Sequence, residues 1–200
     1  MWKHILDFEL RQGFRKTSVL VYFAVFFGLA FLIVNILGGA FTGARIVVGN
    51  ANNNLNAPMV IAMIQTLFSI LGVLVCAALF GNAGYRDYEY NTHPLFFTKP
   101  IKPSDYYWGR FSSAFILNIF IQLGLTLGML FGFLMPYLDQ DAIGPFSLFA
   151  YLHSFLLLVV PNIFLVGAML FTLAVLTRRM LPTYLASVVL LFGYLTAGNL

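Results

Sequence analysis

Long apolar runs, separated by short polar or charged segments, organise the chain from end to end. A helix rises 1.5 Å per residue, so about 20 apolar residues are needed to cross roughly 30 Å of hydrocarbon. The runs are continuous and do not alternate with a period of two, which argues against the strands of a membrane barrel. The pattern predicts an all-α, polytopic transmembrane helical bundle. Its five expected spans cover residues 17–40, 58–80, 107–135, 147–176 and 181–200.

The composition supports a membrane protein and removes several other classes. Apolar side chains make up 60% of the 200 residues and charged ones only 9%, whereas a soluble domain carries about 25% charged residues. The net charge of +4 is spread thinly, which argues against a disordered segment and against a nucleic-acid partner. The single cysteine, Cys76, cannot form an intrachain disulfide and is interpreted as a small packing residue. The lipid bilayer is therefore the first partner that we expect.

The distribution of cations predicts the orientation in the membrane. Ten of the eleven Lys and Arg residues precede the first run, separate the second from the third, or precede the fifth, and only Arg45 lies on the other side. Because short loops rich in Lys and Arg stay in the cytoplasm, we expect a cytoplasmic N-terminus and outer segments over residues 41–57 and 136–146. A cleaved signal peptide is a poor alternative, since the first run is longer than the apolar part of such a leader and four more runs follow.

Residues 1–16 predict an interfacial amphipathic helix ahead of the first span. Apolar side chains recur on one side of its helical wheel, at Trp2, Ile5, Leu6, Leu10 and Phe14. Glu9 falls among these apolar positions and interrupts the pattern. Two interpretations stay open: an anchor that only sets the topology, or a helix that lies along the membrane and receives force from a partner.

The segment between the second and third runs holds an unusual density of charge. Residues 81–106 are predicted to form a cytoplasmic loop, and the stretch from 81 to 110 holds seven of the eighteen charged side chains, interleaved with aromatic ones. We expect a short helix over residues 85–97, a turn containing prolines, and Ser104 as the N-cap of the third span. Aromatic and charged side chains together suit a protein contact, but they equally suit a belt at the level of the lipid headgroups.

Two features within the spans concern packing. Gly124, Gly128 and Gly132 recur at i+4 and leave one face of the third span without side chains, so that another helix can approach closely. That helix belongs either to this chain or to a second subunit. Pro161 lies in the middle of the fourth run and predicts a helix kink, because proline removes a backbone donor.

Signatures of catalysis and of metal binding are missing from the sequence. It contains no G-x-x-x-x-G-K-[ST] stretch for nucleotide phosphates and no H-E-x-x-H pair. The three histidines are far apart, and His153 is the one candidate for an ionisable functional group in a span. Asp139 and Asp141 are interpreted as part of a solvated turn. We therefore expect no catalytic, cofactor or metal site in these residues, no enzyme activity, and no convergence of polar side chains within the spans.

Several stretches together resemble the membrane subunit of a type-2, exporter-type ABC transporter. The likeness extends to the N-terminal part of bacterial proteins that fuse such a permease to a zinc aminopeptidase. The stretches are Trp2-Lys3-His4-Ile5-Leu6-Asp7-Phe8-Glu9-Leu10, Arg86-Asp87-Tyr88-Glu89, Lys99-Pro100-Ile101, and Tyr106 through Gly109-Arg110-Phe111.

The resemblance implies a function and a set of partners. It implies a permease of the bacterial inner membrane that couples ATP hydrolysis by a separate cytoplasmic ATP-binding subunit to export of a substrate, together with a second permease half or as a homodimer. The loop after the second span is then a coupling helix on the ATPase. Its implied partner-coupling residues are Arg86, Asp87, Tyr88, Glu89, Lys99, Pro100, Gly109 and Arg110. The family has six spans per half, so we expect a truncated chain, with any fused peptidase beyond Leu200.

Two other classes of protein are weighed against this one. A non-transporting structural or assembly protein of the bacterial inner membrane would have the same spans but no nucleotide-binding partner. An intramembrane enzyme would need polar side chains that converge within the spans, and the sequence predicts none.

Overall fold

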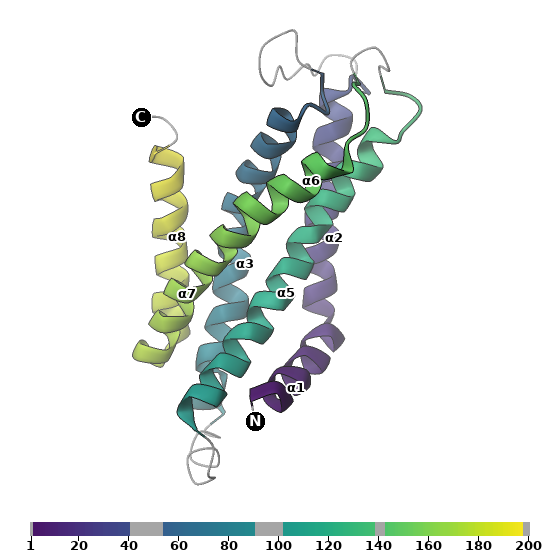
Figure 1. Ribbon diagram of the computed structural model, residues 1–200. Coiled ribbons are helices and arrows are strands. Elements are labelled where there is room, and N and C mark those ends of the chain that lie inside the picture. Colours follow the sequence, from purple (N-terminus) through teal and green to yellow (C-terminus); the bar gives the residue numbers. More distant parts are fainter. Residues whose placement is uncertain (1, 41–53, 91–101, 139–142, 198–200) are drawn as a thin grey trace. The chain divides into compact units, whose positions relative to one another are not determined.

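The chain is an all-helical, polytopic membrane protein. The computed structural model describes residues 2–40, 54–90, 102–138 and 143–197, and no strand occurs among them. The helices are α1 (Trp2–Arg15), α2 (Thr17–Leu37), α3 (Pro58–Glu89), α5 (Pro103–Phe133), α6 (Leu148–Ser154), α7 (Val160–Thr177) and α8 (Met180–Ala197), with a π-helical turn (Phe155–Val159) between α6 and α7 (Figure 1). Within these residues four helices are long and apolar enough to cross a membrane: α2, α3, α5, and the continuous stretch Leu148–Thr177. Helix α8 is a shorter apolar helix.

The contacts divide the chain into two compact units. Unit 1 comprises the described parts of Met1–Val19, Ile70–Ile119 and Asn162–Leu200, and unit 2 comprises those of Leu20–Ser69 and Phe120–Pro161. Helices α3 and α5 contribute residues to both units, so neither unit is a separate segment of sequence.

Helix ends follow local backbone chemistry. Helix α2 ends at Leu37, before Gly39, whose φ of 78° is the left-handed conformation that glycine adopts readily after a helix. Helices α3 and α5 begin at Pro58 and Pro103, where the missing N–H of proline costs nothing because the first N–H groups of a helix have no partner within it.

Most described residues of the loop expected over residues 81–106 are helical instead, and residues 91–101 lie outside the described part of the chain. Helix α3 does not stop near Phe80 but continues to Glu89, so residues 85–89 of the short helix expected over residues 85–97 belong to α3. Helix α5 begins before Ser104, which therefore is not its N-cap. Glycine at 81 and 84 does not end α3, because helices α7 and α8 pack closely against those positions in unit 1.

The expected close packing on the third span is confirmed in unit 2. A Cβ atom built at Gly124 would lie 2.7 Å from the carbonyl oxygen of Phe23, and one built at Gly132 would lie 2.8 Å from the Cβ atom of Val34. A Cβ at Gly128 would collide with the backbone of α2 in the same way. Helix α2 of this same chain therefore packs against the glycine face of α5.

Pro161 is accommodated by a change of helix type. The π-helical turn Phe155–Val159 comes directly before it, and the N–H of Val160 bonds to the carbonyl oxygen of Phe155, five residues back. A π-turn widens the backbone where a proline cannot donate, so the fourth run stays helical through Pro161 and on to Thr177. The irregularity predicted at Pro161 thus takes the form of a π-turn.

Candidate functional site

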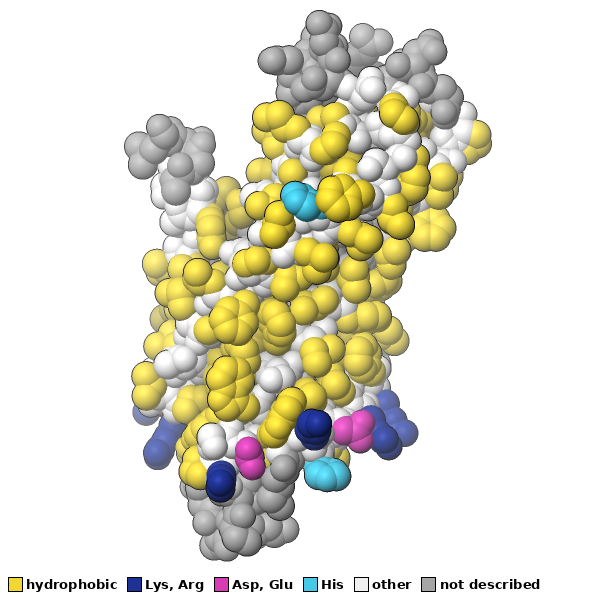
Figure 2. All heavy atoms as spheres, viewed as in Figure 1, with side chains coloured by type: hydrophobic (Ala, Val, Ile, Leu, Met, Phe, Trp, Pro, Cys, Tyr) yellow, Lys and Arg dark blue, Asp and Glu magenta, His cyan; other side chains and the backbone are white. Residues whose placement is uncertain are grey.

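All the charged side chains that the structure describes belong to unit 1. In Figure 2 the Lys, Arg, Asp and Glu side chains that face the viewer lie in one band. Five polar residues of this unit, which we call the ion cluster, lie close together although they come from three helices. They are Glu9 of α1, Arg86 and Asp87 of α3, and Tyr106 and Arg110 of α5.

Ion pairs hold the cluster together. An Nη atom of Arg86 lies 2.5 Å from a carboxylate oxygen of Glu9, and an Nη atom of Arg110 lies 3.5 Å from the same oxygen. The same Nη atom of Arg110 donates to a carboxylate oxygen of Asp87 at 2.6 Å. Arg110 therefore bridges a carboxylate of α1 and a carboxylate of α3.

Hydrogen bonds fix the orientation of these groups. The second Nη atom of Arg110 donates to the carbonyl oxygen of Ala83 at 3.0 Å, and the Tyr106 hydroxyl donates to Asp87. The Arg110 guanidinium also lies 4.9 Å from the centre of the Tyr106 ring. Such charge-assisted bonds are stronger than neutral ones, so the cluster connects the three helices strongly.

The ion pairs of the cluster are buried, which increases the effect on stability of removing one partner. The side chains of Arg110, Asp87 and Glu9 are only 4%, 8% and 12% exposed. Removing one partner of a buried ion pair leaves an uncompensated charge, which typically destabilises a protein by about 3–5 kcal/mol. The cluster therefore stabilises the packing of α1 on α3 and α5 only while all of its members are present.

Lys16, which follows α1, reflects the charge of this region. Burial lowers the pKa of Lys16, the nearby Arg86 guanidinium lowers it further, and Glu9 opposes part of the change. Lys16, at the junction of α1 and α2, is thus partly desolvated and lies near Arg86 of α3.

The residues expected to couple to a partner have different environments. Asp87 and Arg110 are buried and paired with each other, so within this chain they join α3 to α5, and their coupling to a partner stays a prediction. Gly109 packs against α1, where a Cβ atom would lie 3.0 Å from that of Ile5. Glu89 is exposed at the end of α3. Lys99 and Pro100 lie outside the described residues.

Tyr88 and Arg86 complete this comparison. The Tyr88 ring lies 4.9 Å beneath the guanidinium of Arg178, in the turn between α7 and α8. Arg86 is turned toward α1, where it also donates to the side-chain oxygen of Gln12 at 3.2 Å. Most of the predicted coupling residues therefore join helices of this chain to one another.

The sequence interpretation missed the role of Glu9. Glu9 lies on the apolar side of the predicted amphipathic helix, where an acidic residue is not expected. The structure explains its position, because that side packs on α3 and α5 and the carboxylate pairs there with Arg86 and Arg110. An acidic residue on the apolar face of an otherwise amphipathic helix was the available indication of a buried partner.

The expectation that polar side chains do not converge within the spans is also wrong. In unit 2 the Gln65 amide nitrogen lies 3.2 Å from the Thr126 hydroxyl and donates to the carbonyl oxygen of Tyr151 at 3.3 Å. In unit 1 the buried Cys76 thiol lies 3.6 Å from the side-chain oxygen of Asn118. These contacts join neighbouring helices and are typical of packing in lipid.

Metal chemistry receives no support from the described geometry. Among the residues that the structure describes, no three His, Cys, Asp or Glu side chains lie close enough to hold a metal ion. His153 is exposed in α6 and lies against the ring of Phe149, at 5.2 Å between ring centres.

Comparisons with known proteins add no identity. No protein-family model, no curated protein and no solved structure matches the chain.

Proposed function

We propose that the chain is the membrane subunit of an exporter-type ABC transporter, with its N-terminus in the cytoplasm of a bacterium and a separate ATP-binding subunit as its partner. The observation that carries the proposal is the ion cluster. It ties α1 to the ends of α3 and α5, the two helices that flank residues 91–101, which include Phe96, Phe97 and Lys99.

The proposed coupling is mechanical. A partner that pushes on residues 91–101 would move the adjoining ends of α3 and α5. Because Arg110 and Arg86 hold Glu9, α1 would have to move with those ends rather than slide over them. Helix α1 leads directly into α2, which begins at Thr17, so the displacement would reach the first span.

Helix α3 also offers an exposed surface for the partner. Glu89 is exposed, and Tyr90 beside it is 68% exposed, whereas Asp87, two residues earlier, is buried. A tyrosine and a carboxylate at the tip of a rigid helix suit a protein contact. The partner would bind the C-terminal end of α3, and the adjacent ion cluster would transmit the force to α1.

The membrane subunit performs no bond chemistry in this proposal. ATP binding and hydrolysis in the partner bias an equilibrium between two arrangements of the spans. A second permease half or a second copy of this chain would complete the export path.

A matched pair of charge reversals tests the proposal. The full chain is reconstituted in proteoliposomes with the P-loop ATPase that co-purifies with it in mild detergent, and ATP hydrolysis is measured with and without the chain. We expect stimulation by the wild type, loss of stimulation with Glu89→Lys, and normal stimulation with Asp7→Lys. Asp7 is an equally suitable exposed acid, since its side chain is 63% exposed and only pairs with Arg11 on α1.

Two outcomes would contradict the proposal. One is an ATPase rate that does not change when the chain is added. The other is a mild-detergent purification that yields no nucleotide-binding protein, which would favour the non-transporting structural or assembly protein.

A further inference from the structure

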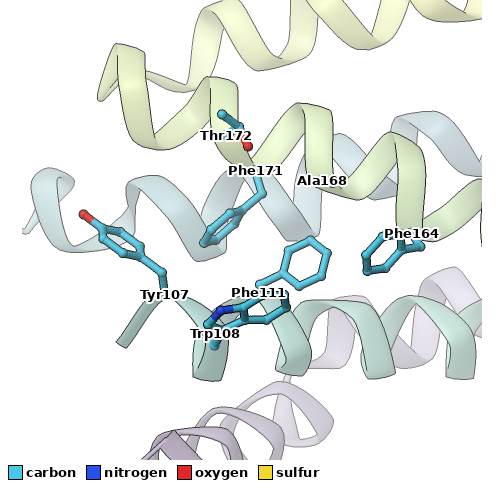
Figure 3. A pocket seen from close by; sticks show the side chains of 7 residues that line it. All are labelled: Tyr107, Trp108, Phe111, Phe164, Ala168, Phe171 and Thr172. Carbon is cyan, nitrogen blue, oxygen red and sulfur yellow. The ribbon is translucent and has the colours of Figure 1, made fainter. Parts of the chain in front are cut away.

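Helices α5 and α7 form an aromatic groove in unit 1. It encloses about 220 Å³. Its lining residues are Tyr107, Trp108 and Phe111 of α5 with Phe164, Ala168, Phe171 and Thr172 of α7 (Figure 3).

The shape of the groove comes from one small residue among large ones. The Phe111 ring lies 5.6 Å from the rings of both Phe164 and Phe171, in edge-to-face arrangements. Ala168 lies between those two phenylalanines on α7 and leaves the space open. Trp108 and Phe164 are 59% and 47% exposed, so the groove opens on the outer surface of the helices. In a membrane that surface faces lipid, and an apolar hollow of this kind suits an acyl chain.

Cations gather at one end of the groove. Arg178 and Arg179 follow Thr172 by about 9 Å along the α7 axis at 1.5 Å per residue, and both are exposed. The two helices run in opposite directions along the groove, so the start of α5 and the end of α7 lie at the same end of it. Lys102, which directly precedes α5, is therefore a third cation at this end. Glu89 and Asp105 are the acidic side chains of these helix ends, beside the buried Asp87. Within the described residues, neither Arg178 nor Arg179 has a carboxylate at ion-pair distance.

A chain of contacts connects the groove to Arg178. Tyr107, in the groove wall, lies close to the side chain of Tyr88. The guanidinium of Arg178 lies over the ring of that same tyrosine, at 4.9 Å. The positive charge is therefore held beside the mouth of the groove.

The backbone of Arg178 gives an independent indication. Its φ of 51° is left-handed, at a helix end where glycine is the usual residue. A non-glycine residue in this conformation is strained, and such strain is typical of functional positions. Arginine at this position keeps a cation next to the groove, which glycine could not do.

We propose that this groove binds one acyl chain of an anionic phospholipid and that Arg178 and Arg179 contact its phosphate headgroup. Trp108 and Tyr107 lie where aromatic side chains commonly mark the headgroup level. Basic residues near a membrane surface attract anionic lipids. The assignment does not depend on the proposed transport function.

The two tryptophans of the chain allow a direct measurement. In a Trp2→Phe background, Trp108 is the sole tryptophan and reports contact with lipid through its fluorescence. The protein is reconstituted in phosphatidylcholine vesicles containing the same mole fraction of acyl-brominated phosphatidylglycerol or acyl-brominated phosphatidylcholine. We expect phosphatidylglycerol to be favoured at Trp108 by about fivefold for each contacting arginine.

Variants separate the headgroup contact from the groove. Arg178→Gln with Arg179→Gln should abolish the preference while leaving equal quenching by both lipids, and Arg11→Gln with Arg15→Gln on α1 should keep it. Ala168→Phe should fill the groove and reduce quenching by phosphatidylglycerol severalfold, whereas Leu165→Phe, at a position 57% exposed on α7, should not. The arginine pair is exposed, so its replacement does not endanger folding.

Three results would overturn the assignment. They are equal quenching by the two lipids in the wild type, a preference that survives the replacement of both arginines, and a Trp108 that neither lipid quenches because a second copy of the chain covers it in a crosslinked dimer.

Discussion

The two units of this protein hold their helices together by different means. In unit 1, buried ion pairs join α1 to α3 and α5. Unit 2 has no charged side chain among its described residues, and its helices meet at glycines and through neutral hydrogen bonds. A membrane interior strongly disfavours unpaired charge, and apolar burial does not drive helices together in lipid. Unit 2 therefore depends on close backbone approach and amide groups.

Two asparagines show how unit 2 uses amides. The side chain of Asn56 donates to the carbonyl oxygen of Gly144 at 2.8 Å and accepts from the Gly144 N–H at 2.9 Å. Asn35 accepts from the Tyr137 hydroxyl at 2.6 Å and donates to the carbonyl oxygen of Phe31. Each amide thereby satisfies backbone or hydroxyl groups without introducing a charge.

This difference predicts how each unit responds to substitution. The ion cluster depends on every member, because one missing charge leaves another buried without compensation. The contacts of unit 2 are individually small and many. Single substitutions in the cluster should therefore have the largest effects, and the following expectations run from the largest to the smallest.

Arg110→Met should lower the free energy of unfolding most, by about 3–5 kcal/mol, because it leaves Asp87 and Glu9 buried without their shared cation. The measurement is the unfolding midpoint in mild detergent, followed by helical circular dichroism during titration with a denaturing detergent. Arg11→Met is the control, since the Arg11 side chain is 78% exposed in its ion pair. If both variants shift the midpoint equally, the contrast between buried and exposed charge is not what stabilises unit 1.

Gly128→Ala should destabilise unit 2 by about 1–3 kcal/mol, because the new methyl group would meet the backbone of α2 rather than a movable side chain. Gly28→Ala on α2 is the matched control, because no atom lies within 4 Å of a Cβ built there. That control should be neutral or stabilising by about 0.5–1 kcal/mol, since alanine loses less backbone freedom in a helix. The same midpoint measurement compares the two, and equal behaviour would remove the close α2–α5 approach as the basis of unit 2.

Gln65→Leu should have a smaller effect, with a loss of about 0.6–1.7 kcal/mol, which runs from the average to the largest value of double-mutant cycles for hydrogen bonds between membrane helices. The substitution removes the bonds to Thr126 and to the Tyr151 carbonyl. Thr66→Val is the control, because the Thr66 hydroxyl bonds only to the Ala62 carbonyl of its own helix and is exposed. A loss as large as that of Arg110→Met would contradict the distinction between the units.

Arg178→Gly should change stability least. It relieves a left-handed arginine, worth about 1–2 kcal/mol, and it loses a cation–π contact with Tyr88 worth about 0.5–1 kcal/mol at an exposed site. Arg178→Ala loses the contact without relieving the backbone and should lie below both the wild type and the glycine variant in thermal unfolding. An order in which alanine is the more stable variant would mean that the backbone at this turn is not strained.

The sequence allowed packing to be predicted where residues of one kind recur on a single helix face. The glycines at 124, 128 and 132 share a face by their spacing alone, so close approach could be predicted, whereas their partner α2 could not. Pro161 could be predicted to disturb its helix, but not that a π-turn would absorb the disturbance. The limits of α3 were misjudged, because charge after Phe80 was taken as the end of a helix although the helical backbone continues to Glu89.

The candidate site was only partly foreseen. Arg86, Asp87 and Arg110 could be singled out for their charge and, through the resemblance, for coupling to a partner, but not for the ion pairs that they form within the chain. Their true surroundings depend on Glu9, which is far from them in the sequence and belongs to a different helix.

By itself, the sequence determined that this is an all-helical membrane protein whose few charges are concentrated beside particular spans. Those properties follow from the free energy of transferring each side chain into hydrocarbon, which depends on composition and local spacing. Only the tertiary structure decided that α1 is tied to α3 and α5 by buried ion pairs, that α2 lies on the glycines of α5, and that α5 and α7 leave an aromatic groove. These depend on which distant residues meet, and a charge is a surface contact or a buried partner according to what another helix brings to it.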